Sequence, residues 1–205
     1  MLVHPHRAQA IVLLRESGLL SQVLPEIADV VGQTWDELLS VLQRLDQPSL
    51  AVVLAAILRV RPECRVGSAI AERWRLPKRD AERADWLLDQ IGTFFETPSC
   101  PWPRLQRLLL HPGARELINL AAAITSRDHP AVRLWEEKLG LEPHVLNPAP
   151  LVTGSDLLNH GIPAGRRLGE LLEAIRDAQL EGEIDSPQKA LAMAEQLYLM
   201  KAEGH

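Results

Sequence analysis

The chain is poor in aromatic residues and has no long apolar segment. Aromatics make up 4% of its 205 residues, and five of the eight are Trp. Because β-sheet proteins are enriched in β-branched and aromatic residues, this composition argues against an all-β fold. The longest apolar run, Leu50–Leu58, has nine residues, whereas a membrane-spanning helix needs roughly 20. We therefore expect no transmembrane helix and no membrane partner.

Cysteines and targeting signals are scarce as well. The two cysteines, Cys64 and Cys100, form neither a metal-ligand spacing nor a disulfide framework. The N-terminal residues Met1–Arg7 contain no apolar signal-peptide core before the first charge. Together these absences predict a reduced, cytoplasmic location.

The sequence also lacks the motifs of common self-contained active sites. It contains no dinucleotide-binding G-x-G-x-x-G, no P-loop, no H-E-x-x-H and no G-x-S-x-G. Paired aspartates of the D-x-D type, which hold two metal ions in nucleotidyl transfer, are missing too. Most of the seven histidines stand beside Pro or Gly, and none has two further ligands nearby in sequence. We therefore predict no catalytic and no metal-binding residue in this chain.

Leucine and alanine dominate what is present. There are 36 Leu and 23 Ala, both strong helix formers. Apolar residues recur at helical spacing, and 15 Pro and 12 Gly interrupt them at intervals. The pattern predicts an all-α fold, an irregular, curved or elongated array of about ten helices with a C-terminal helical subdomain.

Local signals set the expected helix limits. Thr34 and Glu37 have the spacing of a capping box, Ser49 is a typical N-cap, and Gly18 and Gly92 are expected to end helices. The helix of residues 50–59 is apolar nearly all round and is expected to be central. The expected helices are 5–16, 34–45, 50–59, 64–75, 78–91, 104–110, 114–125, 130–139, 155–159, 164–181 and 187–201. Two proline-rich breaks predict a helical body (1–96), a connector with helices (97–147) and a tail (148–205).

The last quarter of the chain carries a more specific pattern. Leu151-Val-Thr-Gly-Ser-Asp-Leu157 is followed by Gly161-Ile-Pro-Ala-Gly165, Leu168-Gly-Glu-Leu-Leu172 and Gln179-Leu-Glu-Gly-Glu-Ile184. This pattern resembles the C-terminal motif of bacterial tRNA nucleotidyltransferases and poly(A) polymerases, the family that builds or repairs the CCA end of tRNA. The segment Ser17–Glu26 resembles a weaker signature of the same family's helical body.

The resemblance implies an RNA-gripping body and tail. In the family, a separate N-terminal head transfers CMP and AMP from CTP and ATP to an RNA 3′-hydroxyl with Mg²⁺. The head's Gly-Ser turn and paired aspartates have no counterpart here, so we expect neither a cofactor nor catalysis in this chain, and tRNA or another RNA as its partner. Ala164-Gly165-Arg166 stands where the family often has Pro-Gly-Pro. Arg59 and Val60 stand where some relatives carry a metal-binding His-Asp pair, and Val60 cannot ligate a metal.

Three groups of residues are candidate phosphate contacts. A helix N-terminus at Gly165 would present unpaired amides next to two arginines. The other two groups lie near residue 105 and in the locally basic stretch 59–83. The candidate RNA-binding residues are Gly165, Arg166, Arg167, Arg104, Arg107, Arg75, Lys78 and Arg79. Alternatively, the glycines allow close packing of neighbouring helices, and the charges form an ordinary solvated surface.

A second reading of the whole chain stays open. The net charge of −5 and the missing head are also compatible with a non-enzymatic helical module that binds protein. A Leu-rich exposed patch would be its sign. Oligomeric state does not follow from the sequence.

Overall fold

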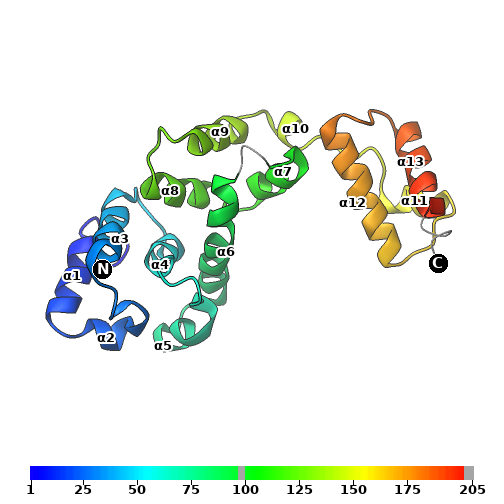
Figure 1. Cartoon of the computed structure of the whole chain (residues 1–205). Coiled ribbons are helices and arrows are strands. Elements are labelled where there is room, and N and C mark those ends of the chain that lie inside the picture. Colours follow the sequence, from blue (N-terminus) through cyan, green and yellow to red (C-terminus); the bar gives the residue numbers. More distant parts are fainter. Residues whose placement is uncertain (97–99, 201–205) are drawn as a thin grey trace. The chain divides into compact units, whose positions relative to one another are not determined.

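The computed structural model describes residues 1–96 and 100–200 of the chain. These residues form thirteen α-helices and no strand (Figure 1), which confirms the all-α prediction. The chain divides into two compact units, residues 1–99 with 111–140 and residues 100–110 with 141–205. Residues 97–99 of the expected connector and residue 201 of the expected last helix lie outside the described residues.

The first unit is built around α4. Its α-helices are α1 (Arg7–Glu16), α2 (Leu20–Val23), α3 (Gly32–Arg44), α4 (Leu50–Leu58), α5 (Ala71–Trp74), α6 (Lys78–Phe95), α8 (Ala114–Ile124) and α9 (Pro130–Leu139). A 3₁₀ turn, Pro25–Ile27, follows α2, and a π-helical segment, Val66–Ile70, precedes α5.

Every side chain of α4 from Ala51 to Leu58 is buried, because α3, α6 and α8 pack around it. Burying each such Val, Leu or Ile contributes roughly 1.5–3 kcal/mol. Ser49 caps the helix as predicted, its Oγ accepting the Val52 amide at 3.3 Å. The expected central helix is therefore confirmed.

Two predicted helix limits in this unit are wrong. The capping box at Thr34 does not form, because α3 begins two residues earlier, at Gly32. Gly32 has a φ of +62°, a conformation that suits glycine. Glu37 accepts instead from Nε2 of Gln33, at 2.8 Å. Helix α6 continues past Gly92 to Phe95, because the buried Phe94 ring packs against another ring of the core.

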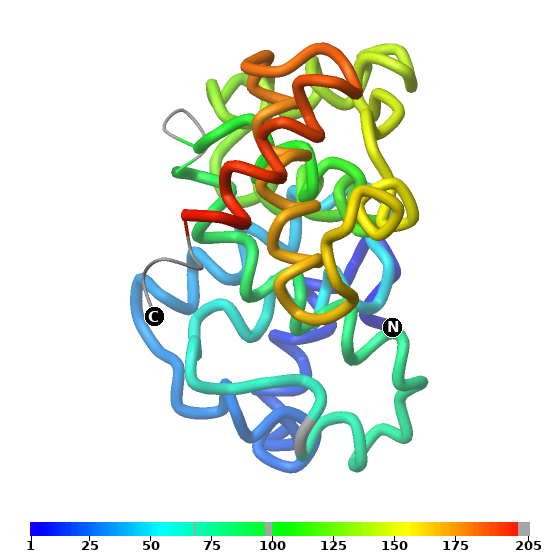
Figure 2. Tube along the Cα trace, turned by 90° about the vertical axis from the view of Figure 1, so that its right-hand side faces the viewer, coloured from blue at the N-terminus to red at the C-terminus, as the bar shows by residue number. Residues whose placement is uncertain are grey.

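The second unit joins α7 to the C-terminal helices. It contains α7 (Trp102–Leu110), α10 (Pro143–Leu146), α11 (Gly154–Asn159), α12 (Arg166–Glu181) and α13 (Pro187–Met200). Helices α12 and α13 run side by side (Figures 1 and 2), with α7 and α11 packed on α12. The core consists of Val152, Leu157, Ile162, Leu171, Ile175, Ala190 and Ala194. The predicted segment 97–147 thus contributes helices to both units.

Two polar contacts hold this unit together. The side chain of Gln106 on α7 is buried and donates to the carbonyl of Leu146 at 3.1 Å and to Oδ1 of Asn147 at 3.2 Å. At the start of α11, Thr153 Oγ1 accepts the Asp156 amide, and Oδ2 of Asp156 accepts the Thr153 amide at 2.7 Å. Hydrogen bonds from the Thr153 side chain and backbone lower the pKa of Asp156.

Candidate nucleic-acid interface

Arg75, Lys78 and Arg79 lie together at the turn between α5 and α6. Arg75 follows the last residue of α5, and Lys78 and Arg79 are the first two residues of α6. All three are exposed. We call this group the cationic corner. Three cations within five residues can face the closely spaced phosphates of a nucleic acid strand.

The backbone of Arg75 is in the left-handed region, with φ 50° and ψ 46°. Glycine is the usual residue at such a helix end, and an L-residue there costs roughly 1–2 kcal/mol. The Arg75 amide donates to Glu72 O at 3.2 Å, and the Leu76 amide donates to Ala71 O at 3.0 Å, so α5 is closed by this turn. The Arg75 guanidinium has no hydrogen-bond or ion-pair partner among the described residues. The fold therefore keeps an unpaired cation at a strained position.

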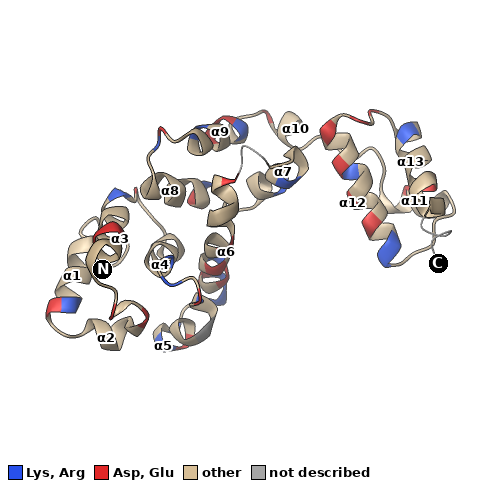
Figure 3. Ribbon diagram, viewed as in Figure 1, with Lys and Arg blue, Asp and Glu red and all other residues tan. Residues whose placement is uncertain are grey.

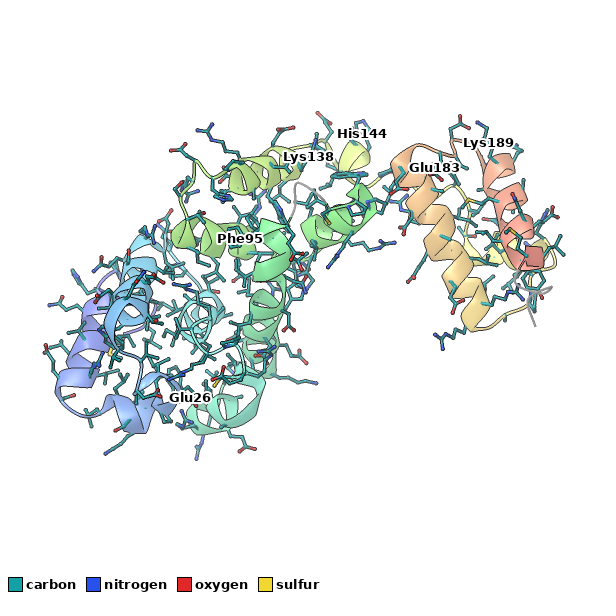
Figure 4. The ribbon with its side chains drawn as sticks, in the orientation of Figure 1. Glu26, Phe95, Lys138, His144, Glu183 and Lys189 are labelled. Carbon is teal, nitrogen blue, oxygen red and sulfur yellow. The ribbon has the colours of Figure 1, made fainter. Side chains whose placement is uncertain are left out.

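The neighbouring charges are partly neutralised. Lys78 Nζ lies 3.5 Å from Glu82 Oε1 in an exposed pair, whereas Arg79 pairs with none of the described residues. Arg73 binds Glu26 at 2.7 Å, and Figure 4 labels Glu26 in this part of the unit. Burial alone would raise the pKa of Glu26, but the hydrogen bond from Arg73 helps to hold it below its ordinary value. Arg73 is thus a structural cation, and Arg75 and Arg79 are left open to solvent.

The surface around the cationic corner is not uniformly positive. Figure 3 shows Lys and Arg positions interspersed with Asp and Glu positions along α6. Asp80 lies in the first turn of this helix. Attraction to an anionic partner is therefore confined to the corner itself, and salt weakens it strongly because all three cations are exposed.

In the second unit, Gly165 and two arginines stand at the start of α12. Gly165 is the N-cap, with φ +146°, and no side chain caps the helix. The Arg166 side chain is 94% exposed and its Nε lies 3.1 Å from Glu170 Oε1. Arg167 instead turns to α13: its Nη2 donates to the Tyr198 carbonyl, and its guanidinium lies 4.2 Å from the centroid of the Tyr198 ring. Of the two arginines, only Arg166 is displayed to solvent.

Close packing does not explain the glycines of this region. A Cβ added to Gly161, Gly165 or Gly169 would meet no atom within 4 Å, so the close-packing interpretation is wrong for all three. Gly161 has φ +91° and ends α11, as expected for a left-handed stop. At Gly161 and Gly165 the backbone conformation is the reason for glycine.

The arginines of α7 differ in their surroundings. Arg107 forms an ion pair with Asp177 of α12. The nearby Arg176 lies on α12, and its pKa is lowered by burial and then by the cation of Arg107. Arg104, one turn before Arg107, is exposed and has no ion pair within the described part of the chain. Arg104 is therefore the available phosphate contact on α7.

His111 follows α7 in sequence but belongs to the first unit. Its ring stacks on Trp86, with centroids 3.7 Å apart and an interplanar angle of 18°. The Gly113 amide donates to His111 Nδ1 at 3.1 Å. Burial, and then the cation of Arg83, lower the pKa of His111. The imidazole is therefore a neutral structural group.

Near His111, three side chains form a polar network that no sequence pattern predicts. Ser49 Oγ donates to Glu116 Oε1 at 2.5 Å, and Arg83 Nη1 donates to the other carboxylate oxygen at 2.6 Å. It joins three helices, because Ser49 caps α4, Arg83 lies on α6 and Glu116 lies on α8. Both ion-pair partners are mostly covered, so the network serves the packing of the first unit.

Four of the five tryptophans are either buried or engaged with a partner in the first unit. Trp35 and Trp135 are buried in the core. Trp74 Nε1 donates to the Val23 carbonyl at 3.2 Å, and Trp86 is covered by His111. RNA recognition through these four rings would require them to leave their present partners.

Comparison with known protein families, with curated proteins and with solved structures found no match to this chain. Within residues 1–96 and 100–200, no group of three or more His, Cys, Asp or Glu side chains is placed to hold a metal ion. Among the same residues, no helix combines the length and apolarity needed to cross a membrane.

Proposed function

We propose that this chain binds RNA by contacts to the phosphate backbone, with the cationic corner as its main contact. The observation that carries the proposal is Arg75, an exposed and unpaired cation on left-handed backbone where glycine would be more stable. Strained backbone that a fold retains is a reason to look for function. Arg79 adds a second unpaired cation next to it.

The contacts would position RNA without reading its sequence. Arginine donates bidentate hydrogen bonds to phosphate oxygens, which carry no sequence information. Base stacking is not supported by Trp35 and Trp135, which are buried, or by Trp86, which is stacked on His111. In the second unit, Arg104 and Arg166 are the candidate contacts. Arg104 has no ion pair among the described residues, and Arg166, although paired with Glu170, is 94% exposed, whereas Arg107 and Arg167 are bound to Asp177 and Tyr198.

The biological role in this proposal is the RNA-gripping body and tail of a CCA-adding or poly(A)-adding nucleotidyltransferase. The support for that role is the sequence pattern of residues 151–184. Transfer of CMP or AMP would take place elsewhere, on a catalytic head with Mg²⁺ and the nucleoside triphosphates. Residues of this chain would hold the RNA while its 3′ end is extended.

Fluorescence anisotropy with labelled tRNA at low salt tests the proposal. The double variant Arg75→Ala/Arg79→Ala is compared with the matched control Arg133→Ala/Lys138→Ala, which removes the same charge from the same unit. Arg133 pairs with Asp128 and Lys138 with a neighbouring glutamate, so both control cations are already neutralised. We expect the first variant to weaken binding at least tenfold, about 1.4 kcal/mol, and the control to bind like the original chain. Equal affinities for the two variants, or no binding by the original chain, would refute the proposal.

One observation favours a second candidate function, a protein-binding module. Helices α12 and α13 enclose an apolar groove of about 290 Å³ whose lining includes Leu171, Ala174, Leu197 and Met200. Leu199 is 62% exposed and Met200 64%. Exposed apolar surface of this kind marks interaction sites. If RNA binding fails and Leu199→Glu abolishes a self-association seen by sedimentation, this candidate is the better one.

A further inference from the structure

A cleft between α8 and α9 is lined by none of the residues assigned above to RNA. Its volume is about 440 Å³, and it is lined by Arg115, Ile118, Asn119, Arg127, Glu136, Leu139 and Gly140. The volume lies within the roughly 300–1,000 Å³ range of small-molecule sites. All the lining residues belong to the first unit, so the cleft is complete within one compact body.

The cleft combines apolar and charged walls. Ile118 is buried and Leu139 is half-buried, which gives the cleft an apolar surface. Arg115 is exposed and makes neither an ion pair nor a hydrogen bond with the residues that the structure describes. One charged side chain of the lining is therefore left without a protein partner.

The second guanidinium, that of Arg127, is held by weak contacts. Its Nη1 lies 3.3 Å from Glu136 Oε1, and its Nη2 lies 3.6 Å from Asp46 Oδ2, all on exposed side chains. Exposed pairs of this kind contribute little, about 0–1 kcal/mol. A stronger acceptor entering the cleft can therefore draw Arg127 away from both Asp46 and Glu136 at small cost.

We propose that this cleft binds a small organic phosphate ester. A phosphate group has enough oxygens to accept from Arg115 and Arg127 together, and each guanidinium offers paired N–H donors. Ile118 and Leu139 provide an apolar surface for the carbon skeleton. The Glu136 carboxylate, freed from Arg127, accepts a hydrogen bond from a hydroxyl or amino group of the ligand.

An RNA backbone phosphate and a phosphate monoester both present anionic oxygens to arginine, but the backbone diester carries one negative charge and the monoester close to two. The two differ in size, since a cleft of this volume encloses one mononucleotide but not a strand. The site also differs from the cationic corner in its residues, so loss of one does not imply loss of the other. The RNA proposal and this one can therefore fail separately.

A titration of the ¹⁵N-labelled full chain, followed by two-dimensional NMR, tests the site. The probes are inorganic phosphate, AMP and a single-stranded RNA of about ten nucleotides. We expect AMP to shift the amides of Arg115, Ile118 and Gly140 saturably, and more tightly than inorganic phosphate. Arg115→Ala should weaken AMP binding at least tenfold, Arg115→Lys should lose less because it keeps the charge, and Arg79→Ala should have no effect.

Several outcomes overturn the proposal. One is the absence of saturable shifts with AMP. Another is equal affinity for AMP and inorganic phosphate, which would show that the apolar wall plays no part. If the RNA shifts the cleft amides and AMP does not, the cleft is a contact for the RNA backbone and not a small-molecule site. Unchanged AMP affinity in a folded Arg115→Ala variant would also exclude the assigned anion contact.

Discussion

The guanidinium of Arg7 closes the C-terminal end of α3, where its Nη1 donates to the Leu42 carbonyl at 2.8 Å. The same nitrogen donates to Leu45 O at 3.0 Å, and Nε donates to Leu2 O at 3.2 Å. The Arg7 side chain is 3% exposed. A charged side chain thus satisfies carbonyls that a helix end leaves without intrahelical partners, and it ties α1 to α3.

Replacing Arg7 with Met should destabilise the first unit by about 3 kcal/mol. Methionine fills a similar volume but leaves buried carbonyls without donors, and each such group costs roughly 1–3 kcal/mol. Urea unfolding followed by circular dichroism measures the change. Arg79→Met is the control, with an expected change within about 0.5 kcal/mol because Arg79 is exposed. Similar midpoints for the two variants would show that the Arg7 contacts contribute nothing net.

Two glycine-to-alanine substitutions should have opposite effects on stability. A Cβ on Gly113 would lie 2.7 Å from Cζ3 of Trp86, a ring already stacked on His111, so Gly113→Ala should cost about 1–3 kcal/mol. Gly92 lies inside α6 with no atom within 4 Å of an added Cβ, so Gly92→Ala should gain about 0.5–1 kcal/mol. Thermal unfolding of both variants distinguishes these outcomes. Equal shifts would contradict the packing described around Trp86.

His111 should make the fold less stable in mild acid. Its pKa in the fold is lowered below the ordinary value of 6.5 by burial and by the cation of Arg83, while Glu116 acts in the opposite direction. As the pH falls below 6.5 the unfolded chain binds a proton that the folded chain does not, so stability falls until the lowered pKa is passed. Asparagine can keep an acceptor near Nδ1 but does not titrate. The stability of His111→Asn should therefore fall less than that of the original chain between pH 7 and pH 5, measured by urea unfolding.

Much of the fold follows from the sequence because the signals are local. Leucine and alanine at helical spacing predict the long helices, and Ser49 and Gly18 act where expected, as an N-cap and as a left-handed stop. The four-residue helices α2 and α10 are too short to show a periodic pattern. The end of α6 depends on Phe94 packing against Trp135, a contact between distant segments that no local pattern predicts.

The two capping boxes also show that a local sequence pattern does not always predict the structure. The spacing at Thr34 predicts a box that does not form, whereas the Thr153–Asp156 box forms without having been predicted. A glycine two residues before Thr34 changes where that helix begins, so the motif falls inside the helix instead of at its start. Spacing alone therefore does not decide which motif becomes a cap.

The candidate site was less predictable than the fold. Which arginines are free depends on partners far away in sequence, such as Asp177 for Arg107 and the Tyr198 carbonyl for Arg167. The left-handed backbone of Arg75 could not be predicted from the sequence, because such a conformation is usually inferred from a glycine. The sequence identifies the candidate arginines and lysines, but only the structure shows which of them have hydrogen-bond or ion-pair partners.

Arg75→Gly should raise stability while it weakens RNA binding. Glycine relieves the left-handed strain, offset in part by the larger entropy of its unfolded chain, for a net gain of about 0.5–1 kcal/mol. Gln47 is the matched control, since it also has positive φ (38°) and is exposed, yet carries no charge. Gln47→Gly should raise the melting temperature similarly and leave RNA affinity unchanged. If Arg75→Gly stabilises the chain with no loss of RNA affinity, the strained cation has no role in binding.

The salt dependence of RNA binding tests the central claim most directly. Three exposed cations on single-stranded phosphates give a slope of log K against log salt of about −2. We predict that the corner contributes about −2 to the slope of the original chain, and that the slope of Arg75→Ala/Arg79→Ala is shallower by about 1.4 because two of its three cations are removed. A slope near zero, or the same slope for both proteins, would contradict the assignment of the cationic corner as the RNA contact.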